Sequence, residues 1–157
     1  MTNTTHNIRA IVIDPFTKSV YDHTMNAGED GGYHELRRII GCDIVQRVSL
    51  GGRVDAWIDD EGLLTDWDTQ AFCKLVSPTD PEQSITLAGK VVLLSHNGRG
   101  DSISLPWMMT KELVERTVQW VEPKDARFPG TTFTTFGPDG SMRTEHVGPE
   151  WLTYDNH

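Results

Sequence analysis

The sequence offers few of the features from which an activity is usually recognised. It contains two cysteines, Cys42 and Cys73, and its six histidines lack the i, i+4 spacing of a zinc site. Neither Ser95 nor Ser102 lies in the strand–turn–helix context of a nucleophile elbow. We therefore expect no resident metal, no cofactor and no catalytic residue, and we interpret both cysteines as buried, reduced thiols.

Basic charge is also scarce. The chain has 14 Lys and Arg residues against 23 Asp and Glu residues, which gives a formal net charge of −9. Direct binding to a nucleic-acid backbone requires a basic face, so this class of function is not expected. The same acidity is compatible with docking on a basic protein surface.

Long apolar runs are missing as well. None approaches the ~20 residues of a membrane-spanning helix, and residues 1–7 are polar, without the apolar centre of a signal peptide. We expect a cytoplasmic protein with no membrane partner. Its 157 residues suit one compact domain, residues 1–157.

The first part of the chain alternates strand, turn and helix signals. Residues 33–40 place Tyr33, Leu36 and Ile40 on one apolar helical face, and Gly41 is suited to end that helix. Strands are predicted by their β-branched or alternating sequences at residues 8–14, 20–25, 44–50 and 54–59. We expect Leu36 and Ile40 to share one core with Val48, Ile58 and Val92.

The second part is predicted to complete this structure. Its elements are a helix at 66–76, a central strand at 90–95, a short strand at 102–105, a helix at 111–122 ended by Pro123, and a hairpin of residues 131–136 and 142–147. The fold class is α+β: a mostly antiparallel sheet built from hairpins, with short helices on one face and a C-terminal helix and hairpin.

Three segments carry a resemblance to a known family. They are the strand Ile8–Pro15, the helix-to-strand passage Glu35–Val45 and the hairpin end Asp59–Leu64, together with Leu87–Leu93. With them, residues 8–105 resemble a family of small uncharacterised proteins found mainly in bacteriophages, plasmids and actinobacteria, and residues 106–157 form an extension. The resemblance implies a mobile-element accessory protein and supplies no activity. A phage-encoded member would act in the cytoplasm of its host cell.

Two loops contain candidate ligand-binding residues. In the first loop, glycines Gly31 and Gly32 enter the predicted helix and can present amides to an anion, with Arg37 one turn further on. In the second loop, His96 follows the central strand and lies near Arg99 and nearby acids. Arg47, on a predicted strand, is a further cation for a small nucleotide.

Two groups of side chains remain open to more than one interpretation. The carboxylates of Asp55, Asp59, Asp60 and Glu61 are interpreted as an exposed hairpin end, because their spacing does not match a calcium loop. The five tryptophans are divided between core and surface, where they would favour stacking or protein contact. They are Trp57, Trp67, Trp107, Trp120 and Trp151.

The sequence therefore favours a non-enzymatic phage or mobile-element accessory protein that binds a host component. Counter-defence is the expected role, either by sequestering a small nucleotide signal or by blocking a host protein. The alternative is a small enzyme acting on a nucleotide or nucleic acid, with His96 and nearby acids as its working groups. Whether the chain forms a homo-oligomer stays open.

Overall fold

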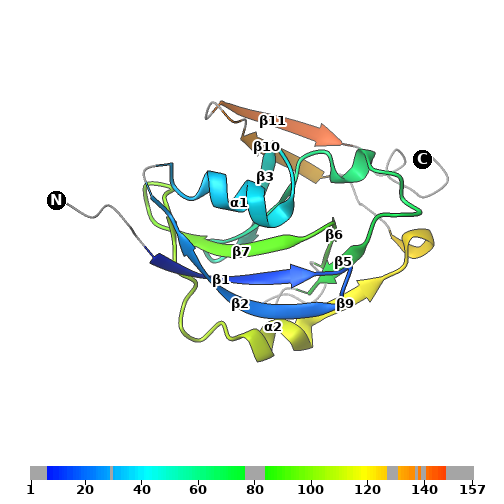
Figure 1. The fold of residues 1–157 in the computed structure, drawn as a ribbon, viewed down its shortest axis with the longest axis horizontal. Helices are drawn as coiled ribbons and strands as arrows, with labels where there is room; N and C mark the ends of the chain where they lie inside the picture. Colours follow the sequence, from blue (N-terminus) through cyan, green and yellow to red (C-terminus); the bar gives the residue numbers. More distant parts are fainter. Residues whose placement is uncertain are drawn as a thin grey trace.

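The structure, a computed structural model, describes residues 7–28, 30–76, 84–126, 131–136, 138 and 141–147. It is an α+β fold, as predicted, with two antiparallel sheets instead of one (Figure 1). The larger sheet has the order β11-β10-β3-β4-β7-β1-β2, with β8 pairing to β7, and the smaller has the order β6-β5-β9. Among the described residues, neither helix is long and apolar enough to cross a membrane.

The elements follow one another as two hairpins, a β-rich middle and a C-terminal hairpin. They are β1 (Asn7–Asp14), β2 (Ser19–Asn26), α1 (Tyr33–Ile40), β3 (Val45–Gly51), β4 (Val54–Asp59), the 3-10 turn η1 (Gly62–Leu64), β5 (Phe72–Leu75), β6 (Ile85–Ala88), β7 (Val91–His96), β8 (Ser102–Ile103), α2 (Lys111–Thr117), β9 (Val118–Val121), η2 (Pro123–Asp125), β10 (Thr131–Phe136) and β11 (Met142–Val147). The predicted hairpins and the helix at 33–40 are confirmed.

Strand β7 lies inside the larger sheet, between β4 and β1. Its run of apolar residues is buried from Val91 to Leu94, which confirms the predicted central strand. Successive side chains of a strand point to opposite faces, so a continuous apolar run needs cover on both faces. The two faces of the sheet are covered by different elements.

One face is covered by α1. Leu36 is fully buried and packs in a cluster with Val92 and Trp57. The ring of Tyr33 contacts that of Trp57 edge-on, with centroids 5.6 Å apart. At its start the helix is held to β2 by Glu35, which accepts hydrogen bonds from the Asn26 amide and from His23. The predicted apolar face of this helix is therefore confirmed.

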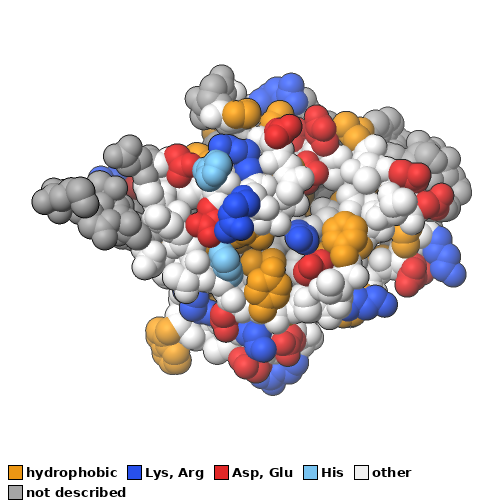
Figure 2. Space-filling view, viewed as in Figure 1, with side chains coloured by type: hydrophobic (Ala, Val, Ile, Leu, Met, Phe, Trp, Pro, Cys, Tyr) orange, Lys and Arg blue, Asp and Glu red, His pale blue; other side chains and the backbone are white. Residues whose placement is uncertain are grey.

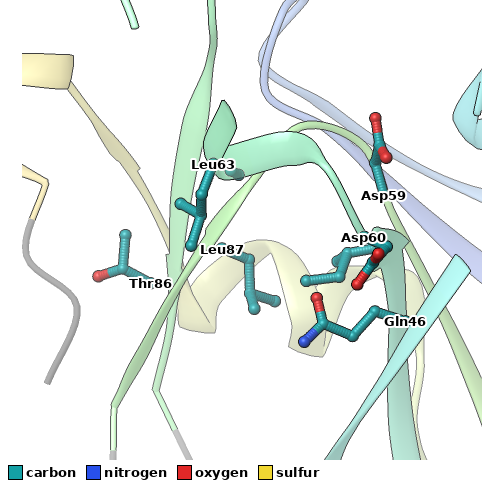
Figure 3. Close-up of a pocket in the computed structure, with 8 residues that line it drawn as sticks. Gln46, Asp59, Asp60, Leu63, Thr86 and Leu87 are labelled. Atoms are coloured by element: carbon teal, nitrogen blue, oxygen red, sulfur yellow. The ribbon is translucent and has the colours of Figure 1, made fainter. Parts of the chain in front are cut away.

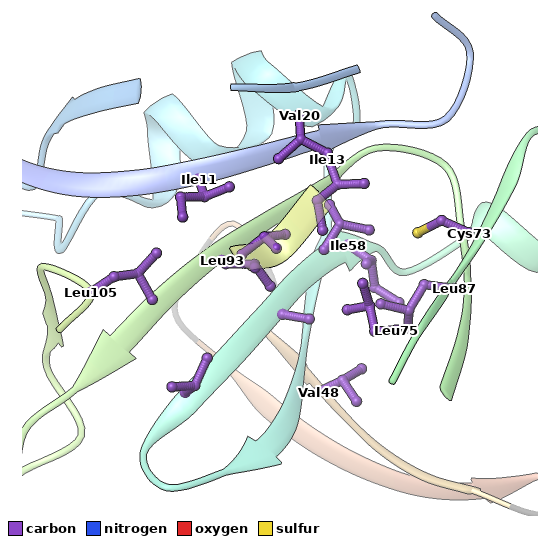
Figure 4. Packing of buried hydrophobic residues seen from close by; sticks show 14 residues of the cluster. Ile11, Ile13, Val20, Val48, Ile58, Cys73, Leu75, Leu87, Leu93 and Leu105 are labelled. Carbon is purple, nitrogen blue, oxygen red and sulfur yellow. The ribbon is translucent and has the colours of Figure 1, made fainter. Parts of the chain in front are cut away.

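The opposite face is covered by the smaller sheet and by α2. Leu75 and Leu87 of the smaller sheet share a buried cluster with Ile58 and Leu93 of the larger one (Figure 4). Val114 of α2 joins the same cluster. The two helices therefore lie on opposite sides of the larger sheet, and the single helical face that we predicted is corrected.

The prediction of one shared core was also wrong in part. Leu36 and Val92 lie in the cluster under α1, with Ile40 packed against it, whereas Val48 and Ile58 lie in the other cluster. All residues of β4 from Val54 to Ile58 are buried, so its alternation does not reveal which set faces the helix.

Two predicted helices are partly or wholly strands. Residues 66–76 form a turn followed by β5, which pairs with β6 on one side and β9 on the other. The helix predicted at 111–122 ends at Thr117, because Val118–Val121 joins β5 as a strand. In both segments the pairing with distant strands outweighs a weak helical pattern. The predicted packing of Trp151 concerns a residue outside the described part of the chain.

Replacing Leu36 with alanine tests the placement of α1. Removal of this fully buried side chain should lower the free energy of unfolding by ~2–5 kcal/mol, or roughly 5–15 °C in melting temperature for a chain of this length. The matched control is Arg38→Ala, which removes an exposed ion pair to Glu35 and should cost less than about 1 kcal/mol. Equal melting temperatures for the two variants would contradict the packing of α1.

Candidate functional site

A small hollow lies where the two sheets meet. It is lined by Gln46 of β3, by Ile58 and Asp60 at the end of β4, by Leu63 of η1 and by Leu87 of β6 (Figure 3). Its empty space is about 280 Å³, counting the part open to solvent. The lining residues therefore come from both sheets and from η1.

The segment after β4 is held firmly. The Asp60 amide donates to the Ile44 carbonyl, and the Asp59 carboxylate accepts from the Glu61 amide at 2.8 Å. Further along, the buried Gln70 side chain donates to the Gly62 carbonyl at 2.7 Å. The walls of the hollow on this side therefore have a fixed backbone.

Gln46 is the unusual residue of this hollow. It is 5% exposed, and its side chain points into the hollow toward Leu87 (Figure 3). Its amide makes no side-chain hydrogen bond to the residues that the structure describes. The amide is not one of the buried side-chain groups without a partner in the described part of the chain, so water reaches it at the mouth of the hollow. Our sequence analysis missed it, although a glutamine in the apolar row Ile44, Gln46, Val48 is a visible signal.

Negative charge gathers at the mouth of the hollow. Burial raises the pKa of the Asp59 carboxyl above its ordinary value, and the neighbouring carboxylates Glu61, Asp60 and Asp43 raise it further. The hydrogen bond from the Glu61 amide lowers this pKa, but it does not cancel the rise. Burial, together with Asp59 and Asp43, also raises the pKa of the Cys42 thiol to about 12. These shifts indicate a locally negative potential. Among the described residues, no group of three or more His, Cys, Asp and Glu side chains is placed to hold a metal ion.

His96 is paired with a buried carboxylate on the α1 side of the larger sheet. Its Nδ1 lies 2.7 Å from Oδ2 of Asp55, whose residue is 1% exposed. The second carboxylate oxygen, Oδ1, has no hydrogen-bond partner among the described residues. The interpretation of Asp55 as part of an exposed hairpin end was wrong, because its carboxylate is buried against His96, a residue that the sequence had singled out separately. An imidazole oriented in this way can present Nε2 as a base.

The predicted anion loop already contains its own anion. The Asp30 carboxylate accepts from the Gly32 amide through Oδ1 and from the His34 amide through Oδ2, both at 2.9 Å. Gly31 and Gly32 adopt positive φ values of 71° and 92°, as the entry to α1 requires. An external phosphate at these amides would have to displace Asp30.

The predicted cations do not converge on one point. Arg37 lies in the last turn of α1, near Cys42, and Arg99 lies on the turn between β7 and β8. Arg47 lies near Tyr33. Burial raises the pKa of the Tyr33 hydroxyl, the positive charge of Arg47 lowers it, and the negative charges of Asp101 and Asp30 raise it. This combination gives no cluster of positive charge for a nucleotide.

A second exposed feature is the turn before α2. Trp107 is 84% exposed and Met108 is 62% exposed, whereas Trp57 and Trp67 are buried. In Figure 2 an apolar group projects from the lower left edge, where Figure 1 draws the segment before α2. Over the rest of that face acidic and basic side chains are interspersed (Figure 2). Exposed tryptophan is uncommon and is enriched at protein contacts.

Arg9 of β1 fixes the conformation of this turn. One guanidinium nitrogen, Nη2, donates to the carbonyls of Pro106 at 2.8 Å and Met109 at 2.7 Å, and Nη1 bonds the Asp22 carboxylate at 3.2 Å. The Arg9 backbone also bonds Ser104 and Leu105. At the other end of the turn, Thr110 caps α2 by accepting from the Leu113 amide. The turn is therefore anchored on both sides.

Comparison with known proteins gives one finding. A family model described as "Domain of unknown function (DUF3846)" matches residues 8–118. The resemblance over residues 8–105 to a family of uncharacterised proteins is thus confirmed, and it extends through α2. No curated protein and no solved structure matches the chain.

Proposed function

We propose that this chain, which belongs to the family of the domain of unknown function DUF3846, is a non-enzymatic binding protein that docks on a partner protein. The observation that carries the proposal is the anchored turn with exposed Trp107 and Met108. Energetic hot spots of protein interfaces are enriched in tryptophan, and a fixed turn loses little conformational entropy on binding.

The charge of the chain supports a basic partner. A net charge of −9 steers the protein toward positive surfaces and away from anionic ones such as nucleic acids and acidic membranes. The partner we propose has an apolar pocket for Trp107 inside a basic surface. If the chain comes from a phage or another mobile element, the partner is a host protein and blocking it is a form of counter-defence.

Sequestration of a small nucleotide is less well supported. The hollow has a cavity volume of about 20 Å³, room for about one water molecule, whereas typical small-molecule pockets span about 300–1,000 Å³. The arginines proposed for the phosphates, Arg37 and Arg99, belong to separate elements. We therefore favour docking over sequestration.

The proposal is tested with protein purified from its own host. Native mass spectrometry identifies the retained partner, and the affinity of Trp107→Ala is then measured against it. We expect a loss of about 30-fold or more, which corresponds to ~2 kcal/mol for a hot spot, with little change in melting temperature. The control is Met142→Ala, which removes a side chain that is 66% exposed on β11 and should bind normally. A retained small molecule in place of a protein, or equal affinity for Trp107→Ala, would contradict docking through this turn.

The second candidate is an enzyme acting on a nucleotide or nucleic acid. The specific observation in its favour is the contact of 2.7 Å between His96 and buried Asp55, which orients the imidazole for general-base catalysis. If this candidate is correct, a panel of nucleotides and nucleic acids with divalent ions should reveal turnover that His96→Ala abolishes and His34→Ala leaves intact. His34 is exposed on α1, and its side chain makes no hydrogen bond or ion pair to the described residues. Absence of turnover, or turnover that survives in His96→Ala, eliminates the enzyme.

A further inference from the structure

Strand β2 ends the larger sheet, and in the described part of the chain no strand pairs with its outer edge (Figure 1). Its eight residues pair with β1 in one continuous register. Proteins usually protect such an edge with a short strand, a bulge, a proline or a charged side chain. β2 lacks the first three, and Asp22 is its one carboxylate. The edge is therefore open to a further strand that tolerates this carboxylate.

The direction of the backbone groups on β2 follows from the pairing of Thr24 with Arg9. The Arg9 amide donates to Oγ of Ser104 at 2.9 Å, and the Arg9 carbonyl accepts from the Leu105 amide at 3.0 Å. Both bonds lie on the side of β1 away from β2, so this facing pair is one without mutual backbone hydrogen bonds. The amide and carbonyl of Thr24 therefore point outward, as do those of Asp22 two positions earlier. They make no hydrogen bond to the described residues.

The side chains beside this edge indicate which strand fits it. On the face covered by α1, Tyr21 is 39% exposed and offers an aromatic ring. On the opposite face, the Asp22 side chain is 55% exposed. Alternate residues of an added strand would face these two side chains, and cross-strand pairs of opposite charge are stabilising. The strand that fits best alternates apolar and basic residues.

The turn that carries Trp107 lies beside the same edge. The Arg9 guanidinium bonds the Asp22 carboxylate at 3.2 Å and the Pro106 carbonyl at 2.8 Å. A strand paired with β2 would therefore pass next to the exposed turn. We propose that an extended, basic segment of the docking partner pairs with β2 as an added strand. In this mode of recognition backbone hydrogen bonds supply affinity, and alternate side chains supply specificity.

The charge of the chain favours such a segment over a second copy of the chain. Two copies that each carry a net charge of −9 repel one another, whereas a basic segment is attracted. The inference rests on the proposed function because the added strand belongs to the docking partner. It concerns backbone groups of β2, whereas the proposed function depends on the side chain of Trp107, so the two can be tested separately.

A synthetic peptide tests the inference without the partner. The probe is a peptide as long as β2 that alternates lysine and valine, and its control is the same peptide with every amide N-methylated. A peptide alternating glutamate and valine tests the charge. In an NMR titration of the labelled protein, we expect saturable shifts at the Asp22 and Thr24 amides with the lysine–valine peptide alone. Absence of these shifts, or equal shifts with either control peptide, would overturn the inference.

A proline substitution tests the backbone of the edge directly. Thr24→Pro removes an outward amide hydrogen and leaves the ladder with β1 intact, because proline is tolerated in an edge strand where its nitrogen faces away from the neighbour. This variant should bind the lysine–valine peptide about fivefold more weakly or worse, with a melting temperature close to that of the original protein. The matched control, Thr24→Ala, keeps the amide and should bind normally. Normal binding by Thr24→Pro would overturn the inference.

Affinities for the purified partner separate the inference from the proposed function. Weaker binding by both Thr24→Pro and Trp107→Ala would support both. Weaker binding by Trp107→Ala alone would overturn the added strand and leave docking through the turn. Weaker binding by Thr24→Pro alone would support the added strand and contradict the role of Trp107. A dimer of this chain that Thr24→Pro converts to a monomer would assign the edge to a second copy and overturn the inference.

Discussion

The burial of β7 on both faces is the constraint on which the rest of the structure depends. Val92 and Leu94 must be covered on one side, and Val91 and Leu93 on the other. Each such side chain contributes roughly 1.5–3 kcal/mol when it is removed from water. Helix α1 meets the first demand, and the smaller sheet and α2 meet the second. The hollow lies at the seam between the two sheets, and residues of both line it.

The same constraint explains the exposed turn. The chain must pass from β8 in the larger sheet to α2 on its covered face, and it does so beside the first residues of β1. Arg9 lies at that point, and its guanidinium donates hydrogen bonds to backbone carbonyls of the turn. The side chains of Trp107 and Met108 are exposed to solvent. The turn is therefore held in one conformation while its apolar side chains stay exposed.

The sequence predicted what depends on local pattern. The hairpins, the helix with Leu36 and the central strand follow from periodicity within short windows. The strands β5 and β9 have four residues each, and they pair with one another across more than forty residues, which no local pattern reveals. The face of β4 could not be assigned either, because its residues are buried on both sides.

The candidate sites divide in the same way. His96 and the carboxylate of Asp55 stood out as residue types near predicted strand ends, but their contact joins strands that are 41 residues apart. The contacts of Arg9 span 97 and 100 residues, so neither its role nor the rigidity of the turn was predictable.

The central claim, that Arg9 presents Trp107 to a partner, is tested most directly by the affinity of Arg9→Lys for the purified partner. Lysine keeps the charge but loses the fork of donors. The account predicts a loss of about tenfold, from ~1.4 kcal/mol of ordering cost, together with faster hydrogen exchange at Leu105 and Met109. Unchanged affinity despite faster exchange would contradict it.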